Sequence, residues 1–205
     1  MKYVALLHGP HFPGAPDAIV GWVRTQGWAE TAMRLVVHVG LPAPVEAGGA
    51  PQPPTYDAVV EIWADAPVAP DAFDGGWDRA IVRASTPVIG KAPMAEVGVG
   101  VTPGLSQLSF IRAIDGMARA EVERHWDEHI PLARDIHVGM NRYVQDRLSP
   151  ADPWFGMAHL HFPDEAALRE GLFRNADDVA LITADVAEFV QDYATMLAVE
   201  HVVKA

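Results

Sequence analysis

The sequence predicts an α+β protein in which two copies of one β-α-β-β-α-β unit pack their antiparallel sheets face to face as an α/β barrel. Three observations favour this fold. Short β-rich segments alternate with amphipathic helical segments along the whole chain. Both halves follow the same order, and Trp22 and Arg34 recur as Trp126 and Arg142 at an offset of about 100 residues. The segments YDAVVEIWAD and WFGMAHLHFP take the same place in the two halves.

The first half contains weaker helical signals than the second. Asp17 precedes an apolar stripe that includes Trp22, which indicates a helix that Gly27 weakens near its end. The Pro/Gly-rich run GLPAPVEAGGAPQPPT has no periodicity and predicts a loop. In chain order we expect a strand at 3–7, a helix from 17 to 27, strands at 35–39 and 56–65, a weak helix at 77–83 and a strand at 96–101.

The second half repeats the pattern with longer helices. In chain order we expect a strand at 108–114, a helix at 118–130, strands at 141–148 and 154–162, a helix at 165–173, helical turns within 177–189 and a closing strand at 194–203. Each half therefore has the ferredoxin-like order, with boundaries at residues 1–103 and 104–205. A four-stranded sheet with helices on one face leaves the other face bare, and two such faces bury each other in a barrel.

Composition excludes several classes of protein. The chain has 205 residues and a net charge of −12, which argues against nucleic-acid and anionic-membrane partners. Because it has no cysteine, disulfides, zinc–thiolate sites, iron–sulfur clusters and cysteine nucleophiles are excluded, and a reducing compartment fits. The apolar run after Met1 is too short for a signal peptide or a membrane span. We expect a soluble, cytoplasmic protein, with a homodimer as one option for its assembly.

One helical segment places a histidine where it could move protons. Val122, Trp126, His129 and Ala133 recur at helical spacing, so His129 lies in the apolar stripe beside Trp126. Pro131 is expected to end or kink the helix just after His129. At a helix C-terminus, unpaired carbonyls favour the imidazolium while burial disfavours it, which suits an acid/base group. The alternative is a buried histidine that only caps a carbonyl.

The strand GMAHLHF carries two further histidines. Alternation places His159 and His161 on the same face as Met157, and small and aliphatic residues on the other face. We expect the histidines to point into the barrel, where the first half offers Glu61 and Trp63 at matching positions. These four residues would form a mixed polar and aromatic pocket. The alternative is a closed hydrogen-bonded pair at the seam between the sheets.

Other candidates carry weaker signals. His159-x-His161 resembles a metal-ligand spacing, but this spacing alone is weak, and we assign no metal site. Trp154 is placed at the mouth of the pocket, where it could stack on an aromatic substrate. His38 lies near the end of a strand, and His201 beside Glu200 on the last strand is more typical of the seam.

Four blocks of the second half, RHWDEHIPLAR, NRYVQDRL, WFGMAHLHFPDEAAL and EHVV, occur in an order and spacing that resemble the EthD family of dimeric α/β barrel proteins. The first half resembles a degenerate copy, with Thr25 in place of His129. The wider superfamily includes cofactor-free cyclases, isomerases, small monooxygenases and haem enzymes. In some of its isomerases and cyclases a histidine at the end of the first helix and a tyrosine on the next strand flank the substrate, and His129 and Tyr143 match those places.

These observations lead to one main hypothesis and two alternatives. The main one is a cofactor-independent lyase, isomerase or cyclase that moves a proton on a small aromatic or carbonyl-bearing hydrophobic molecule. The alternatives are a haem- or metal-binding oxidoreductase of the same superfamily and a non-catalytic ligand-binding protein, whose histidines would all be paired. The expected catalytic residues are His129, Tyr143, His159 and His161, and the expected substrate-binding residues are Glu61, Trp63, Trp126 and Trp154, with no metal and no cofactor.

Overall fold

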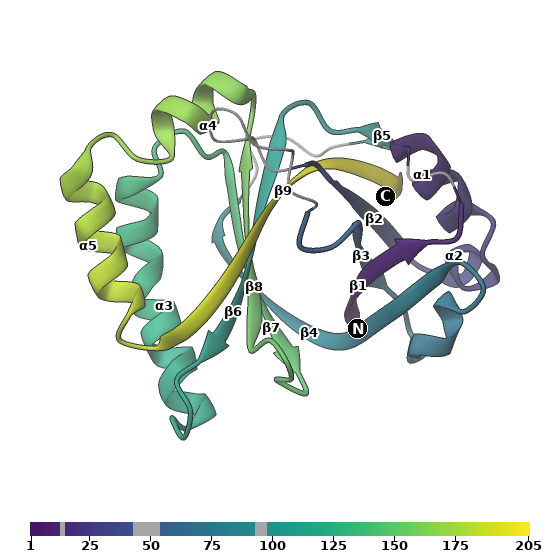
Figure 1. Cartoon of the computed structure of the whole chain (residues 1–205), viewed down its shortest axis with the longest axis horizontal. Coiled ribbons are helices and arrows are strands. Elements are labelled where there is room, and N and C mark those ends of the chain that lie inside the picture. The colour runs from purple at the N-terminus through teal and green to yellow at the C-terminus, as the bar shows by residue number, and fades with distance from the viewer. Residues whose placement is uncertain (13–14, 43–53, 93–97) are drawn as a thin grey trace.

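An antiparallel barrel with helices on its outside makes up the computed structural model, which describes residues 1–12, 15–42, 54–92 and 98–205 (Figure 1). Its strands are β1 (Lys2–Pro10), β2 (Arg34–Gly40), β3 (Ala58–Trp63), β4 (Trp77–Lys91), β5 (Gly100–Val101), β6 (Leu105–Ala113), β7 (Arg142–Ser149), β8 (Gly156–Phe162) and β9 (Val190–Lys204). Its helices are α1 (Pro16–Arg24), α2 (Gly27–Thr31), the 3-10 turn η1 (Pro70–Phe73), α3 (Arg119–Ile136), α4 (Glu165–Gly171) and α5 (Ala176–Val186).

The strands form a closed ring in the order β2-β3-β1-β4-β7-β8-β6-β9, and β9 returns to β2. The short strand β5 adds to β9. Two strands of 15 residues, β4 and β9, join the halves: β4 pairs with β1 and then with β7, and β9 pairs with β6 and then with β2. The α+β class and the barrel predicted from the sequence are therefore confirmed.

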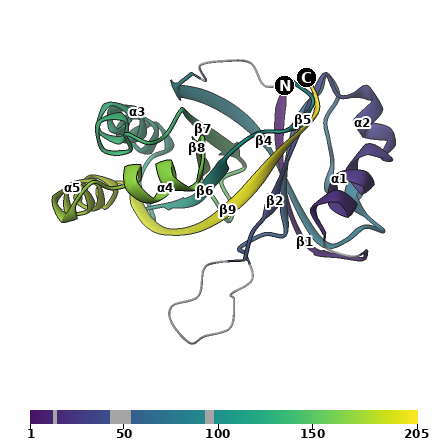
Figure 2. The same ribbon diagram turned by 90° about the horizontal axis from the view of Figure 1, so that it is seen from above.

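The helices cover two opposite sides of the barrel (Figures 1 and 2). Helices α1 and α2 pack on the outer face of the first four strands, where Ile19 and Val23 belong to one buried cluster with Leu35 and Val60. Helices α3, α4 and α5 lie beside the outer face of β7, β8 and β6. The barrel interior has its own apolar cluster, formed by Val4, Leu6, Tyr56, Val59, Ile81, Leu108, Phe110, Leu148, Met157, Met196 and Ala198.

Two predicted elements are wrong. Residues 77–83 form part of β4 and not a helix: Trp77 and Ile81 are four residues apart, as on a helix face, but the free edge of β1 pairs with them, Leu6 opposite Ile81. Helix α3 does not end after His129 but continues through Pro131 to Ile136. Proline removes one backbone donor, and the burial of Ala133 and Ile136 against the sheet side offsets that loss.

The remaining predicted elements occur, with shifted boundaries. The helix after Asp17 ends at Arg24, and α2 follows as a separate short helix. Most of the predicted loop at 40–55 and part of the predicted strand at 96–101 lie outside the described residues. None of the helices within the described ranges is both long and apolar enough to cross a membrane.

Candidate functional site

A layer of polar side chains crosses the barrel interior, and each of the eight strands of the ring contributes to it. Strand alternation turns these residues inward. All except Arg142 are buried. We call them the polar layer: Lys2 (β1), His38 (β2), Glu61 (β3), Ser85 (β4), Ser106 (β6), Arg142 and Asp146 (β7), His159 (β8) and Glu200 (β9).

Lys2 is the cation on one side of the layer. Its Nζ lies 2.7 Å from Asp146 Oδ1 and 2.9 Å from Glu61 Oε2, and it stands 4.8 Å from the centre of the Trp63 ring. The Ser85 hydroxyl donates to Asp146 Oδ1 at 2.6 Å. Burial opposes ionisation of Glu61, but Lys2 and the two histidines outweigh it and hold the pKa of Glu61 well below its usual value. Burial and repulsion from Glu61 raise the pKa of Asp146, although Lys2 opposes this rise.

His38 and His159 form the centre of the layer, with their rings 4.7 Å apart and nearly perpendicular. His38 Nε2 lies 3.1 Å from Glu61 Oε1. His159 Nε2 lies 3.0 Å from Ser106 Oγ and 3.2 Å from Arg142 Nη2. Because a guanidinium only donates, Nε2 of His159 is the accepting nitrogen, and the proton belongs on Nδ1, 3.5 Å from Glu61 Oε1.

Glu200 closes the layer on the side of β9. It accepts from Arg142 Nη1 at 3.2 Å, from Arg142 Nη2 and from Thr102 Oγ1 at 2.6 Å. Burial opposes its ionisation, but His38, His159 and Arg142 lower the pKa of Glu200 to about 2. Burial, and then Arg142, lower the pKa of His159 to about 3. At neutral pH Glu200 is therefore ionised and His159 is neutral.

The fixed charges of the polar layer do not balance. Lys2 and Arg142 carry two positive charges, and Glu61, Asp146 and Glu200 carry three negative charges when all are ionised, so the sum with neutral histidines is −1. Unbalanced charge in a buried site is costly. One proton or one further cation in the layer would remove most of this cost.

His161 lies next to the polar layer on β8. Its Nδ1 contacts Asn141 Oδ1 at 2.8 Å, whereas its Nε2 is buried without a hydrogen-bond partner among the described residues. Burial, and then Arg142, lower the pKa of His161 to about 4. The Arg34 guanidinium on β2 stands 5.3 Å from the centre of the Trp63 ring.

The structure separates the residues that the sequence proposed for one site. It brings His159, His161, Glu61 and Trp63 together inside the barrel, as strand alternation predicted. Trp154 also packs on the interior cluster, in its apolar part, and donates from Nε1 to Tyr56 Oη at 2.6 Å.

His129, Tyr143 and Trp126 lie outside the barrel, between the sheet and its helices. His129 Nδ1 contacts Asp185 Oδ2 of α5 at 2.6 Å. The Tyr143 hydroxyl accepts from Gln145 Nε2 at 2.9 Å, and burial raises the pKa of Tyr143 to about 12. Trp126 packs between the sheet and α3, in a buried cluster with Val122, Phe155 and Phe189. The sheet thus separates these three residues from His159 and His161.

Sequence reasoning left seven members of the polar layer out of the proposed site: Lys2, His38, Ser85, Ser106, Arg142, Asp146 and Glu200. Four of them are inward residues of strands that the sequence did predict, whereas Lys2, Ser85 and Ser106 lie outside the predicted strands. The signal that could have found them is the alternation of inward and outward residues along each strand. The sequence neighbours that pack against a helix mark the outward positions, so the residues between them must face the barrel interior.

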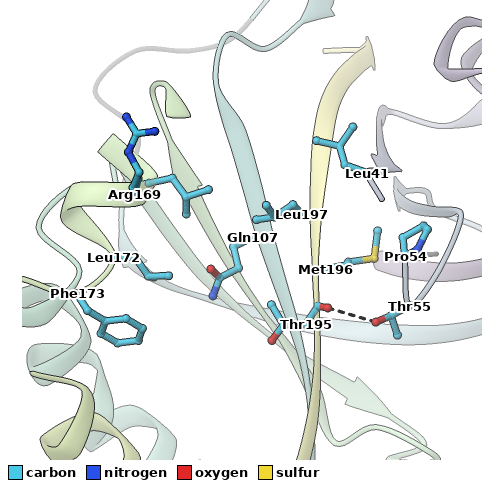
Figure 3. Close-up of a pocket in the computed structure, with 11 residues that line it drawn as sticks. Leu41, Pro54, Thr55, Gln107, Arg169, Leu172, Phe173, Thr195, Met196 and Leu197 are labelled. Carbon is cyan, nitrogen blue, oxygen red and sulfur yellow. Dashed lines mark hydrogen bonds between the residues drawn. The ribbon is translucent and has the colours of Figure 1, made fainter. Parts of the chain in front are cut away.

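A groove opens on the outer face of β6 and β9, beside α4 (Figure 3). Its volume is about 420 Å³, within the range of small-molecule sites. It is mostly apolar, and its polar groups are the Gln107 amide, the Thr55 and Thr195 hydroxyls and the Arg169 guanidinium. Its lining residues are Leu41, Pro54, Thr55, Gln107, Leu168, Arg169, Leu172, Phe173, Thr195, Met196 and Leu197.

Comparison with known proteins gives a family match in the second half and shows the fold. Residues 114–202 match the model of the EthD domain. A search of the curated proteins found no match.

Several solved structures share the fold across nearly the whole chain. An anthrone oxidase-like protein has a TM-score of 0.60 at 11% identity, covering 100% of this chain and 93% of its own. A presumed monooxygenase from Fusobacterium nucleatum has a TM-score of 0.57 at 9% identity, with coverage of 99% and 91%. Another, from Lactobacillus acidophilus, has a TM-score of 0.53 at 11% identity, with coverage of 100% and 96%. The chain thus shares the barrel fold of these proteins, and its residues 114–202 match the EthD domain.

Proposed function

We propose that this protein binds a small, largely apolar organic molecule with an oxygen-bearing end in the groove beside α4. The observation that supports this most directly is the lining: leucine, proline, phenylalanine and methionine side chains surround a few polar groups in a volume of about 420 Å³. Apolar walls supply binding energy, and a few placed polar groups fix orientation.

The polar groups of the groove suggest how a ligand would lie in it. Figure 3 shows Gln107 projecting from β6 on the floor and Arg169 on α4 at one side. The two threonine hydroxyls are already engaged, because Thr195 Oγ1 lies 3.1 Å from Ser109 Oγ and Thr55 Oγ1 donates to the Thr195 carbonyl at 3.3 Å. Arg169 and Gln107 therefore remain the groups best suited to a carboxylate, phenolate or carbonyl oxygen, while Phe173 and Leu172 contact the apolar part.

Two further arguments bear on the class of ligand and of reaction. Structural neighbours are named as an anthrone oxidase-like protein and as presumed monooxygenases, which supports an aromatic or polycyclic ligand and an oxidative reaction. Among the described residues that line the groove, Arg169 is the one ionisable group, so these residues supply no general base. The groove therefore favours binding and orientation of the ligand over proton abstraction by the protein.

A second candidate function is the cofactor-free lyase, isomerase or cyclase activity at His159 and His161. The observation that favours it is the unpartnered Nε2 of His161, a buried acceptor that a substrate hydroxyl could meet. A pKa of about 4 makes His161 a hydrogen-bond acceptor at neutral pH but a weak base. His159 has both nitrogens engaged with Ser106, Arg142 and Glu61. We therefore rank this activity below binding in the groove.

The groove is tested with 2-naphthoate and 2-naphthol as probes, followed by NMR chemical shifts. At about −0.3 kcal/mol per atom, a ligand of about 13 non-hydrogen atoms should bind with a Kd of about 1 mM. Thr195→Trp places an indole in the groove and should weaken both probes at least tenfold. Tyr193→Trp is the matched control, because Tyr193 lies two residues earlier on the same face of β9, is 63% exposed and does not line the groove.

Arg169→Gln distinguishes the two probes. It should weaken 2-naphthoate severalfold and leave 2-naphthol nearly unchanged, because only the carboxylate uses the guanidinium. If folded Thr195→Trp binds both probes like the wild type, the groove is not the binding site. The second candidate function is tested with His161→Gln. If this variant loses turnover while both probes still bind in the groove, the barrel interior is favoured as the reaction site.

We also propose that residues 1–103 and 104–205 are two ferredoxin-like repeats. The strand orders β2-β3-β1-β4 and β7-β8-β6-β9 support this, because each places the first and third strands of its half in the centre. The first half has Thr25 at the position that matches His129, so any chemistry that depends on this histidine would occur once per chain.

A further inference from the structure

We propose that His38, His159 and Glu200 form a binding site for one divalent transition-metal ion inside the barrel. This site lies in the polar layer, on the other side of the sheet from the groove, and does not depend on the proposed function.

The three donors lie close enough to share one ion. One ligand atom from each lies within 4.8 Å of the other two. Glu200 Oε2 stands 3.7 Å from His159 Nε2 and 3.9 Å from His38 Nδ1. Ligands at about 2.1 Å from a metal and at angles of about 90–109° stand about 3.0–3.4 Å apart. The two contacts to Glu200 would have to shorten by about 0.3–0.9 Å, and a separation of up to 4.8 Å between the two histidine nitrogens by about 1.4–1.8 Å, which rotamer adjustments of both rings could share.

Glu61 orients both histidines for this role. His38 directs Nε2 to Glu61 Oε1 at 3.1 Å, and His159 directs Nδ1 to the same oxygen at 3.5 Å. If these nitrogens carry the protons, the other nitrogen of each ring presents a lone pair toward Glu200. Metal-binding histidines almost always donate their second ring N–H to a carboxylate or carbonyl in this way.

An unpartnered nitrogen gives independent support. His38 is fully buried, yet its Nδ1 has no hydrogen-bond partner among the described residues. A buried polar atom left unsatisfied costs about 1–3 kcal/mol. A metal ion would use this nitrogen, and it would also offset the net negative charge of the polar layer.

Arg142 is the competing cation. Its Nη2 contacts Glu200 Oε2 and lies 3.2 Å from His159 Nε2, so it engages two of the three proposed donor atoms. The Arg142 side chain is the more exposed partner, at 12% against 3% for Glu200. A bound metal would displace the guanidinium outward, and Arg142 should therefore weaken metal binding.

The donor set indicates the class of ion. Two imidazole nitrogens and one carboxylate are typical ligands of zinc and of iron, cobalt and nickel in the divalent state. Calcium and magnesium prefer oxygen ligands and fit this site poorly. The open positions of such a site could accept a small oxygen- or nitrogen-containing ligand.

The test uses Co²⁺ and Zn²⁺ with the full chain at neutral pH. Titration calorimetry should show one equivalent bound, and Co²⁺ should give a visible absorption band of a nitrogen- and oxygen-ligated ion. Arg142→Gln should bind at least tenfold more tightly. Glu61→Gln should bind about 10–100-fold more weakly, as the loss of an orienting carboxylate does in other sites.

Two controls separate this site from a surface site. His38→Ala should lose binding, whereas His201→Ala should not. His201 lies opposite Val37 in the ladder of β9 and β2, and Val37 faces the outside of the barrel, so His201 faces away from the site as well. In case His38→Ala does not fold, paramagnetic broadening by Co²⁺ on the wild type locates the ion. Broadening centred on β2, β8 and β9 supports the proposal. Broadening centred on the surface histidines His8 and His11, whose side chains are 37% and 45% exposed, overturns it, as does a lack of stoichiometric binding to folded Arg142→Gln.

Discussion

Replacing Lys2 by methionine should be among the most destabilising single changes in the barrel. Lys2 is the cation between Glu61 and Asp146, its side chain is 4% exposed, and its Nζ lies within 2.9 Å of both carboxylates. Methionine keeps the apolar stem and removes the charge. The polar layer then carries a sum of −2 in place of −1, with two neighbouring buried carboxylates that have lost their shared partner.

The size of the effect follows from the burial. Removing one member of a buried ion pair costs about 3–5 kcal/mol, because the remaining charge loses its compensation. Single domains are stable by about 5–15 kcal/mol, so this is a large share of the total. With a urea m-value of about 2 kcal/mol/M, the midpoint should fall by about 2 M. The raised pKa of Asp146 allows one carboxylate to take up a proton, which sets the lower end of the expected range.

Urea denaturation followed by circular dichroism measures this change. Lys2→Met with Asp146→Asn should recover part of the loss, because the asparagine restores the original sum of charges. Lys204→Met is the control: Lys204 bonds the Glu30 carbonyl at the surface, and its loss should cost less than about 0.5 kcal/mol. A loss below about 1 kcal/mol for Lys2→Met would refute the view that this contact compensates buried charge.

Two further predictions concern the helix-covered face. Gly90→Ala should cost about 1–3 kcal/mol and lower the Tm, since a Cβ there would lie 2.5 Å from the Tyr143 ring; an unchanged Tm would show that the ring moves aside. Burial lowers the pKa of His137, and His129 lowers it further, whereas the hydrogen bond to the Leu172 carbonyl and the charge of Asp178 oppose this shift. Because the pKa is lower in the folded state, this contribution to stability is complete above about pH 6.5 and is lost as the pH falls toward the folded pKa. His137→Asn should therefore have a flatter stability profile between pH 7 and pH 5 by urea denaturation, and parallel profiles would contradict this.

Much of the fold could be predicted because burial has a simple period in most elements. In β8, Met157, His159 and His161 face the interior while Ala158 and Leu160 face the helices, as alternation requires. The pattern failed in β4, where one 15-residue strand serves two neighbours in turn. No local pattern encodes a strand that leaves one half of the barrel for the other, because its partners are set by closure of the ring.

The candidate site was harder to predict because each of eight strands supplies only one or two of its residues. Lys2 and Asp146 are 144 positions apart, and His38 and Glu200 lie on strands of different halves. An isolated charge on a strand is normally solvated, so each residue alone suggests a surface position. Sequence reasoning placed Tyr143 on its strand and His129 on its helix, but His129 does not lie at the helix end as expected, and the sheet separates the face they occupy from the barrel interior.

The groove and the polar layer share two strands and can still be tested separately. On β6, Ser106 faces His159 while Gln107 faces the groove, and on β9, Glu200 faces inward while Thr195 lines the groove. Effects of distant, independent changes add, whereas changes that act on one shared site do not. If the two sites are independent, Thr195→Trp should leave Co²⁺ binding unchanged, and Arg142→Gln should leave 2-naphthoate binding unchanged. If Co²⁺ alters the affinity for 2-naphthoate, the same factor must appear in the affinity for Co²⁺ when 2-naphthoate is bound, and a factor other than one would show that the two sites are coupled.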